Sequence, residues 1–154
     1  MKMLDDLLMI PTLNLNPLNE DGNTPLNEML QHNLIDYAIK LIQDCRCDIN
    51  HCNSKGESPL YFAVSIKNQP LINALIKANA FVNLPNTNGM TPLYKAVENH
   101  DFEITELLLK SGANPNLWYT NGSLPINIAD PSISKLLISY GARQKANSFL
   151  PKQK

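Results

Sequence analysis

The sequence predicts an all-α fold, a solenoid of stacked helix-turn-helix units joined by turns. A pattern that begins with glycine and has proline three residues later occurs four times, starting at Gly22, Gly56, Gly89 and Gly122. It therefore recurs every 33 or 34 residues, as the residue numbers show. An asparagine stands six residues before each of these glycines, at Asn16, Asn50, Asn83 and Asn116. Two marks in the same register predict a repeated structural unit.

Each glycine pattern predicts the start of the first helix of a unit. Glycine permits the positive φ of a tight turn, a following Thr or Ser caps a helix, and proline fits the first helical turn. After one such start, Leu60, Ala63 and Val64 recur at i, i+3 and i+4, and Leu93 begins the same series in the next unit. The spacing predicts a helix with one buried face.

The second helix of each unit is expected to be more apolar, over residues 34–42, 71–76 and 102–109. Asn79, Gly112 and Gly141 follow these segments as expected left-handed caps. Unit one has an extra residue before Asn50, which predicts a bulged turn over 44–48. The last unit is shorter around Asp130-Pro131, so we expect its helix pair to be shortened.

The segments Thr91-Pro92-Leu93 and Gly112-Ala113-Asn114-Pro115-Asn116 resemble the signatures of the ankyrin-repeat family. The resemblance implies an ankyrin-repeat solenoid with projecting turn fingers. The histidine of the family signature is replaced by Asn27, Tyr61, Tyr94 and Asn127. We therefore expect its hydrogen-bond network with the threonine to be altered or weakened.

The same resemblance implies the domain organisation of the chain. In residues 1–18, Leu7 and Leu8 match Leu41 and Ile42 of the first full unit, which predicts a capping half-repeat. We expect full repeats over 19–52, 53–85 and 86–118, a shortened C-terminal capping repeat over 119–143, and a flexible tail over 144–154.

Composition narrows the function classes. The 154 residues are 44% hydrophobic and 18% charged, which suits one folded domain, and the net charge of -1 argues against nucleic-acid binding. No apolar run approaches the roughly 20 residues of a membrane span, so we expect no membrane partner. Three cysteines without a secretion signal favour free thiols and a cytoplasmic location.

The resemblance implies a non-catalytic module that binds another protein through its concave surface and turn fingers, without a cofactor and as a monomer. Adjacent large aromatics, Trp118 and Tyr119, are the expected anchors. The family's contact positions fall at the finger tips and at the ends of the first helices. Here they are Glu20, Asp21, Asn23, Gln31, His32, Ser54, Lys55, Glu57, Ser65, Ile66, Thr87, Asn88, Met90, Glu98, Asn99, Trp118, Tyr119, Thr120 and Asn121.

Three alternative functions stay open. The asparagine-rich composition is typical of AT-rich intracellular bacteria or large viruses, which allows a secreted effector that binds or inhibits a protein in a host cytosol. The family resemblance allows Asn50, in Asp48-Ile49-Asn50, to be the substrate of an asparaginyl hydroxylase. A zinc site is the third alternative, because Cys45, Cys47, His51 and Cys52 lie within eight residues.

Overall fold

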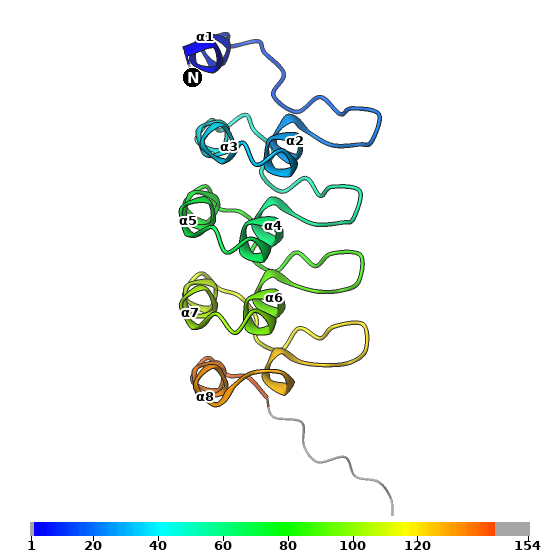
Figure 1. Ribbon diagram of the computed structural model, residues 1–154, viewed down its shortest axis with the longest axis vertical. Coiled ribbons are helices and arrows are strands. Elements are labelled where there is room, and N and C mark those ends of the chain that lie inside the picture. Colours follow the sequence, from blue (N-terminus) through cyan, green and yellow to red (C-terminus); the bar gives the residue numbers. More distant parts are fainter. Residues whose placement is uncertain (1, 144–154) are drawn as a thin grey trace, which may run out of the picture.

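The computed structural model describes residues 2–143, which form a stack of helix pairs with loops projecting to one side (Figure 1). The predicted tail over 144–154 lies outside the described residues. The regular elements in this part of the chain are helical: α1 (Lys2–Leu8), α2 (Pro25–Gln31), α3 (Ile35–Ile42), α4 (Pro59–Ser65), α5 (Gln69–Lys77), α6 (Pro92–Glu98), α7 (Phe102–Lys110), the 3-10 turn η1 (Pro125–Asn127) and α8 (Pro131–Ser139). None of the helices in residues 2–143 is long and apolar enough to cross a membrane.

The helices lie in two columns (Figure 1). The inner column holds α2, α4, α6 and η1, and the outer column holds α1, α3, α5, α7 and α8. The projecting loops are called fingers 1 to 4 and comprise residues 17–24, 51–58, 84–91 and 117–124. Each finger leads into an inner helix, so the fingers and the inner helices together border one side of the stack. The predicted all-α solenoid is confirmed.

The inner helices begin where the glycine-proline pattern predicts. Proline is the first residue of α2, α4 and α6, and each is preceded by a capping Thr24, Ser58 or Thr91. The side-chain oxygen of each cap accepts a hydrogen bond from the backbone N–H three residues later. Such a cap stabilises a helix by about 1 kcal/mol, so short local patterns are sufficient to start these helices.

The last unit is shortened only in its first helix. Here η1 has 3 residues, whereas α8 has 9, as many as α5 and α7. Leu124 stands where the other units have the capping threonine or serine, and it has no side-chain oxygen to hold a first turn. The expectation of a shortened pair is therefore correct for η1 and wrong for α8.

The outer helices of three units end in the predicted left-handed caps. Asn79, Gly112 and Gly141 have φ angles of 63°, 91° and 84°. The extra residue of unit one changes this ending, because no residue from 43 to 47, all of them described, has a positive φ. The turn closes instead through the backbone N–H of Cys47, which donates to the carbonyl of Asp44 at 3.0 Å. The bulge expected at 44–48 thus replaces a left-handed cap.

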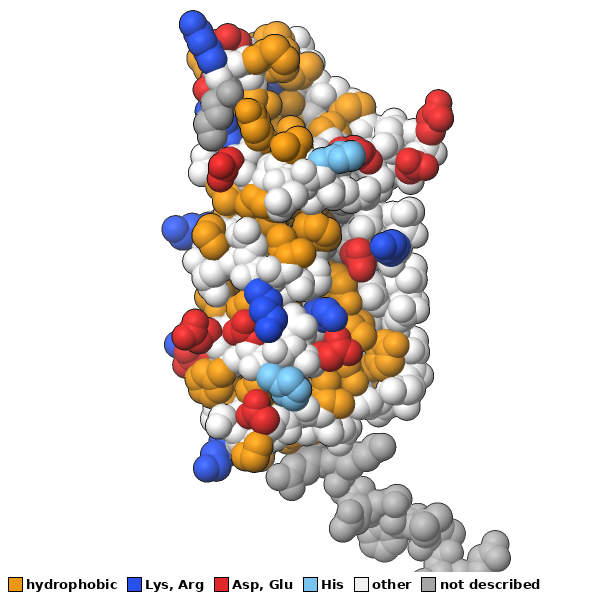
Figure 2. All heavy atoms as spheres, viewed as in Figure 1, with side chains coloured by type: hydrophobic (Ala, Val, Ile, Leu, Met, Phe, Trp, Pro, Cys, Tyr) orange, Lys and Arg blue, Asp and Glu red, His pale blue; other side chains and the backbone are white. Residues whose placement is uncertain are grey.

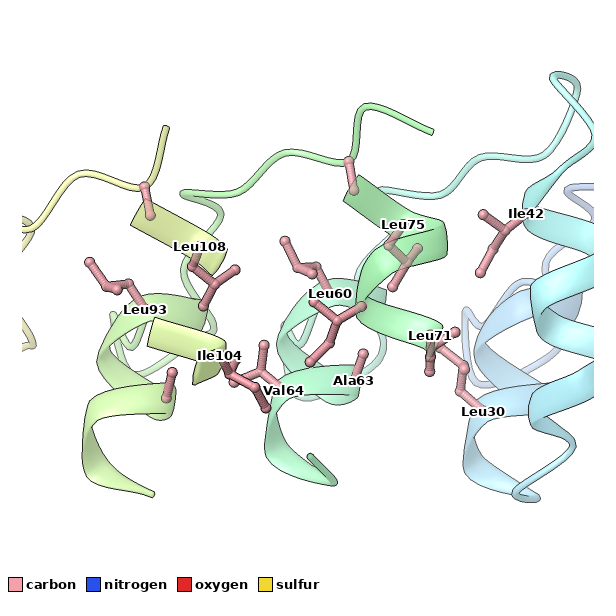
Figure 3. Packing of buried hydrophobic residues seen from close by; sticks show 14 of the residues in the cluster. Leu30, Ile42, Leu60, Ala63, Val64, Leu71, Leu75, Leu93, Ile104 and Leu108 are labelled. Atoms are coloured by element: carbon pink, nitrogen blue, oxygen red, sulfur yellow. The ribbon is translucent and has the colours of Figure 1, made fainter. Parts of the chain in front are cut away.

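Apolar layers between neighbouring units hold the stack together (Figure 3). Leu60, Ala63 and Val64 of α4 are fully buried, with Leu71 and Leu75 of α5 beside them. Burying one such leucine side chain contributes about 1.5–3 kcal/mol. Because these side chains meet those of the adjacent units, the stability of each unit depends on its neighbours.

The register asparagines form a ladder that links each unit to the next. The side-chain amide of Asn83 donates to the Gly112 carbonyl at 3.2 Å and accepts from the Asn114 N–H at 2.8 Å. Asn116 makes the same pair of bonds one unit later, to Gly141 and Arg143. Asn50, one unit before Asn83, contributes one bond, from the Phe81 N–H at 2.8 Å. Asn16, two units before Asn83, makes both bonds, to Arg46 and Asp48. This ladder explains why asparagine recurs with the period of the fold.

One arginine fastens the N-terminal helix α1 and the segment after it to the stack. Arg46 donates through Nη2 to the Leu8 carbonyl at 2.8 Å and through Nη1 to the carbonyls of Ile10 and Pro11 at 2.7 and 3.1 Å. Asp44 binds the same guanidinium, and its hydrogen bonds with Arg46 lower the pKa of the Asp44 carboxyl to about 2. Arg46 therefore satisfies one carbonyl at the end of α1 and two in the segment that follows it.

Candidate functional site

The first three fingers share one internal clamp. In finger 3 the side-chain oxygen of Asn86 accepts hydrogen bonds from the N–H groups of Asn88 and Met90, both at 3.0 Å. Asn19 and Asn53 make the same two bonds in fingers 1 and 2, at distances of 2.8 to 3.1 Å. An asparagine that accepts from its own turn in this way stabilises the turn. The clamp thus holds three of the four finger tips.

The fourth finger has Tyr119 in place of the clamp asparagine. Its backbone keeps the turn, because Tyr119 N–H donates to Ser123 at 2.8 Å and Gly122 N–H donates to Tyr119 at 2.7 Å. The Tyr119 ring packs against Tyr94 of the preceding unit, with 5.4 Å between ring centroids and 32° between the planes. An aromatic contact between units therefore stands where the other fingers have a local amide clamp.

The two predicted aromatic anchors have different environments. Tyr119 is half-buried against Tyr94, whereas Trp118 has 72% of its surface exposed. Trp118 lines a pocket of about 490 Å³ between fingers 3 and 4, together with Pro85, Thr91 and Leu117. Trp118 is thus available to a partner, and Tyr119 positions the finger that carries it.

Fingers 2, 3 and 4 contact one another through threonines. Both the N–H and the hydroxyl of Thr87 lie within hydrogen-bond distance of the Lys55 carbonyl, at 3.4 and 2.9 Å. A Cβ on Gly56, whose φ is +70°, would come within 2.8 Å of the Thr87 methyl, so only glycine fits there. A Cβ on Gly89, whose φ is +79°, would likewise come within 3.1 Å of the Thr120 methyl.

The junction between fingers 1 and 2 is built differently. A Cβ on Gly22 would meet no other atom of the described chain within 4 Å. The ring Nε2 of His51 lies 2.8 Å from the Gly22 carbonyl oxygen, and the Asn27 side chain donates to the His51 carbonyl at 3.1 Å. Hydrogen bonds across a more open junction therefore replace the close threonine contact.

Hydrophobic side chains gather between the inner helices and the fingers of the last three units (Figure 2). Tyr61 and Tyr94, which replace the signature histidine, are each 5% exposed. The Tyr61 hydroxyl donates to the sulfur of Met90 at 3.1 Å. Burial, followed by the nearby Glu57 and Glu98, raises the pKa of Tyr61 to about 12, so this hydroxyl stays protonated at neutral pH.

The network at the signature position is altered as expected, but it is not weakened in the first unit. Asn27 closes a capping box with Thr24, in which each side chain binds the backbone of the other residue. In the last unit the Asn127 side-chain oxygen accepts from the Leu124 N–H at 2.8 Å. Asparagine thus retains a side-chain bond to the cap, and tyrosine does not provide one.

Most predicted contact residues lie at the surface, with one exception. Asn23 is only 4% exposed, because it turns inward and donates to Glu28 at 2.9 Å, so the expectation that it contacts a partner is corrected. The exposed members of the set are Glu20, Asp21, Gln31, His32, Ser54, Lys55, Ile66, Thr87, Asn88, Glu98, Trp118, Thr120 and Asn121, and the half-buried members are Glu57, Ser65, Met90, Asn99 and Tyr119.

The exposed tips are not chemically uniform. Acidic side chains gather at the tip of finger 1, where Glu20 and Asp21 lie (Figure 2). The tips of fingers 3 and 4 carry hydroxyl and amide groups instead. The surface therefore changes from acidic to neutral along the stack, and its aromatic side chains lie at the neutral end.

The cysteine and histidine cluster does not assemble into a metal site. Cys47 is buried in the core at the place of Ala80 and Ala113, and burial raises the pKa of its thiol to about 12. His51 is engaged with Gly22, and within residues 2–143 no group of three or more His, Cys, Asp or Glu side chains is placed to hold a metal ion. The geometry supports the interpretation of Cys47 as a small hydrophobe.

The histidines of the inner-helix ends belong to separate units. His32 lies 3.5 Å from Glu28, and His100 lies 3.9 Å from Asp130 of the last unit. Neither is paired with a nucleophile in the described contacts. Both side chains are exposed, one just after α2 and the other just after α6.

Sequence reasoning missed part of the surface around Trp118. Pro85 and Leu117 line its pocket, and both belong to fingers already inferred from the repeat. Phe81 is 64% exposed in the turn before finger 3 and was not among the predicted contacts. Phe81 could have been found by comparing equivalent positions, because the neighbouring units have the polar residues Asp48 and Asn114 there.

The structure of the Bcl-3 ankyrin repeat domain, described as a unique member of the IkappaB protein family, resembles this chain with a TM-score of 0.72 and 24% sequence identity. The likeness covers 84% of this chain and 57% of that chain, and at this identity it shows the fold alone. Because 487 solved chains match, the fold identifies no particular partner. A search of curated proteins found no match.

The sequence itself also matches a family model. The model describes ankyrin repeats in three copies, and it matches residues 31–118, which is more than half of the 154 residues. The matched range runs from the end of α2 to Trp118 and includes fingers 2 and 3. The register asparagines, the glycine-proline helix starts and the stacked helix pairs agree with this match. The chain belongs to the ankyrin-repeat family.

Proposed function

We propose that this protein binds a partner protein through its fingers and the ends of its inner helices, with the main contact at finger 4. Ankyrin repeats are generally protein-protein interaction modules, and the family is typically non-catalytic. The stack offers a long surface because its units repeat in one direction. The binding involves no covalent step.

The observation that carries this proposal is the altered construction of finger 4. Fingers 1 to 3 use an asparagine to clamp their own turn, whereas finger 4 has Tyr119 packed on Tyr94 and an exposed Trp118 beside a pocket of about 490 Å³. Tryptophan beside a pocket is a common anchor in protein interfaces. The finger that departs from the shared construction thus presents the most favourable contact.

The contacts between fingers support the same proposal. Thr87 on Lys55 and Thr120 on Gly89 join fingers 2 to 4 before any partner arrives. A surface that is already ordered loses less conformational entropy on binding. Trp118 therefore lies at the end of a preformed surface.

The proposed encounter takes place in a reducing compartment such as the cytosol. Cys45, Cys47 and Cys52 are free thiols, which supports this location. Inhibition of the partner, as an effector would exert it, is one consequence of the same binding. It is tested by measuring the partner's own activity with and without this protein.

The test is affinity capture from a cytosolic extract with the wild-type protein and with Trp118→Ala. We expect the variant to lose a partner that the wild type retains, with a loss of about 2 kcal/mol or more in a titration of the purified partner. Leu18→Ala is the matched control, because Leu18 holds the position of Trp118 in finger 1 and is 59% exposed. Equal binding by wild type and Trp118→Ala would refute the main contact, and capture of no protein by the wild type would refute the function.

A further inference from the structure

A second hollow, which none of the predicted contact residues lines, lies beside the pocket at Trp118. This hollow has a volume of about 570 Å³ and is lined by Phe81 and Leu84, among others. Asn83 and Pro85 line both hollows. The two spaces are therefore neighbours, and together we call them the Phe81–Trp118 groove.

Each half of the groove contains a large exposed aromatic side chain. Phe81 is 64% exposed and Trp118 is 72% exposed, which makes them the most exposed aromatic residues in the described chain. Large exposed apolar side chains that lie in adjoining hollows mark interaction sites more often than scattered ones do. The two rings thus indicate two anchor points on one surface.

The groove differs from other hollows of the molecule in its charge. None of the described residues that line its two parts is charged. Other hollows on the described chain contain charged residues, with Asp44 and Lys77 in one, Asp36 and Lys40 in another, and Asp5 in a third. The Phe81–Trp118 groove therefore offers no ion pair to a ligand.

Three polar side chains of the groove are already engaged. The Asn83 amide is bound to Gly112 and Asn114 in the asparagine ladder. The Thr91 hydroxyl caps α6, and the Ser111 hydroxyl donates to the Leu107 carbonyl at 2.8 Å. A charged ligand would lose its hydration here without gaining an ion pair in return. An apolar ligand carries no such penalty.

We infer that the Phe81–Trp118 groove binds an uncharged segment of a partner protein that carries two large apolar side chains, one packed on Trp118 and the other on Phe81. This inference rests on the proposed function and specifies the chemistry of the partner. It extends the binding surface beyond the fingers to the turn after α5. The acidic tip of finger 1 takes no part in this contact.

The experiment is a selection of a random linear peptide library on the full-length wild-type protein. Selected peptides should have an uncharged stretch with two or more large apolar residues. The dissociation constant of the best peptide should rise about tenfold or more in each of Phe81→Ala and Trp118→Ala. Leu18→Ala and Phe102→Ala, which also remove exposed apolar side chains, should bind as the wild type does. All four variants should have the circular dichroism spectrum of the wild type.

The outcomes separate this inference from the proposed function. Peptides with charges in the bound stretch would overturn the inference, and so would peptides that bind Phe81→Ala as well as they bind the wild type. If such peptides fail to bind Trp118→Ala, finger 4 remains the contact. Peptides insensitive to both variants, or no selected peptide, overturn the inference, and the capture experiment then decides the function alone. If sedimentation shows that the wild type forms a dimer and both variants abolish it, the occupant of the groove is a second copy of this chain. The inference of a partner protein is then overturned.

Discussion

At the C-terminal end of the stack, α8 buries Ile133 and Leu137 completely, whereas α1 at the N-terminal end has no buried residue. The first helix is attached mainly by polar contacts, from Arg46 to three carbonyls and from Lys40 to Asp5. Burial of apolar surface from water contributes more than half-exposed polar contacts, which compete with hydration. The two ends of the stack are therefore closed by different forces, and α1 should open first.

The largest expected effect comes from removing the burial at the C-terminal end. Leu137→Ala should lower the free energy of unfolding by about 2–5 kcal/mol, because it leaves a cavity between α7 and α8. Urea denaturation followed by circular dichroism measures this loss. Ile138→Ala, next to it on α8 and 46% exposed, is the matched control and should change little. A similar loss in Leu7→Ala of α1 would contradict the comparison.

A smaller, local effect is expected at the N-terminal end. Arg46→Ala should release α1, so its backbone amides should exchange with solvent much faster than in the wild type, while those of α8 keep their rates. Hydrogen exchange followed by mass spectrometry distinguishes the two ends. Arg46→Lys should restore only part of the protection, because an ammonium lacks the planar fork that reaches several carbonyls. Unchanged exchange in α1 would show that apolar contacts of Leu8 hold the helix instead.

The smallest effect concerns pH. The pKa of Asp44 falls from 3.8 to about 2 in the folded protein because its carboxylate accepts hydrogen bonds from Arg46. A lowered carboxyl pKa contributes stability to the folded protein. This contribution is present above pH 3.8 and is lost as the pH falls toward 2. The NMR signals of α1 amides should therefore shift in this range, and the shift should be absent in Asp44→Asn. The same shift in Asp44→Asn would assign it to other carboxyl groups.

Local patterns were sufficient to predict most of the fold. A helix cap such as Ser58 binds an amide only three residues away, so the signal and the structure occupy the same short stretch. The register asparagines were also visible, although their bonds reach 25 to 32 residues ahead. They could be recognised because the same residue recurs once per unit.

Features that occur once in the chain were not predictable in this way. Arg46 reaches carbonyls 35 to 38 residues earlier, and no other unit repeats the contact. Trp118 and Tyr119 are neighbours in sequence, but one faces solvent and the other packs on Tyr94, which depends on the shape of the adjacent unit. Asn23 was placed at a finger tip, like its equivalents Glu57 and Met90, from the contact positions of the family, but its bond to Glu28 draws it inward.

The uneven junctions between fingers have a mechanical consequence. The threonine contacts at Gly56 and Gly89 leave little room for one finger to slide on the next, whereas finger 1 meets finger 2 through the bond of His51 to the Gly22 carbonyl. Under a bending force, the last three fingers should therefore move together as a rigid unit, and the bending should concentrate at a hinge near His51. The curvature of the stack should then change mainly at this hinge, which is distant from finger 4 and Trp118.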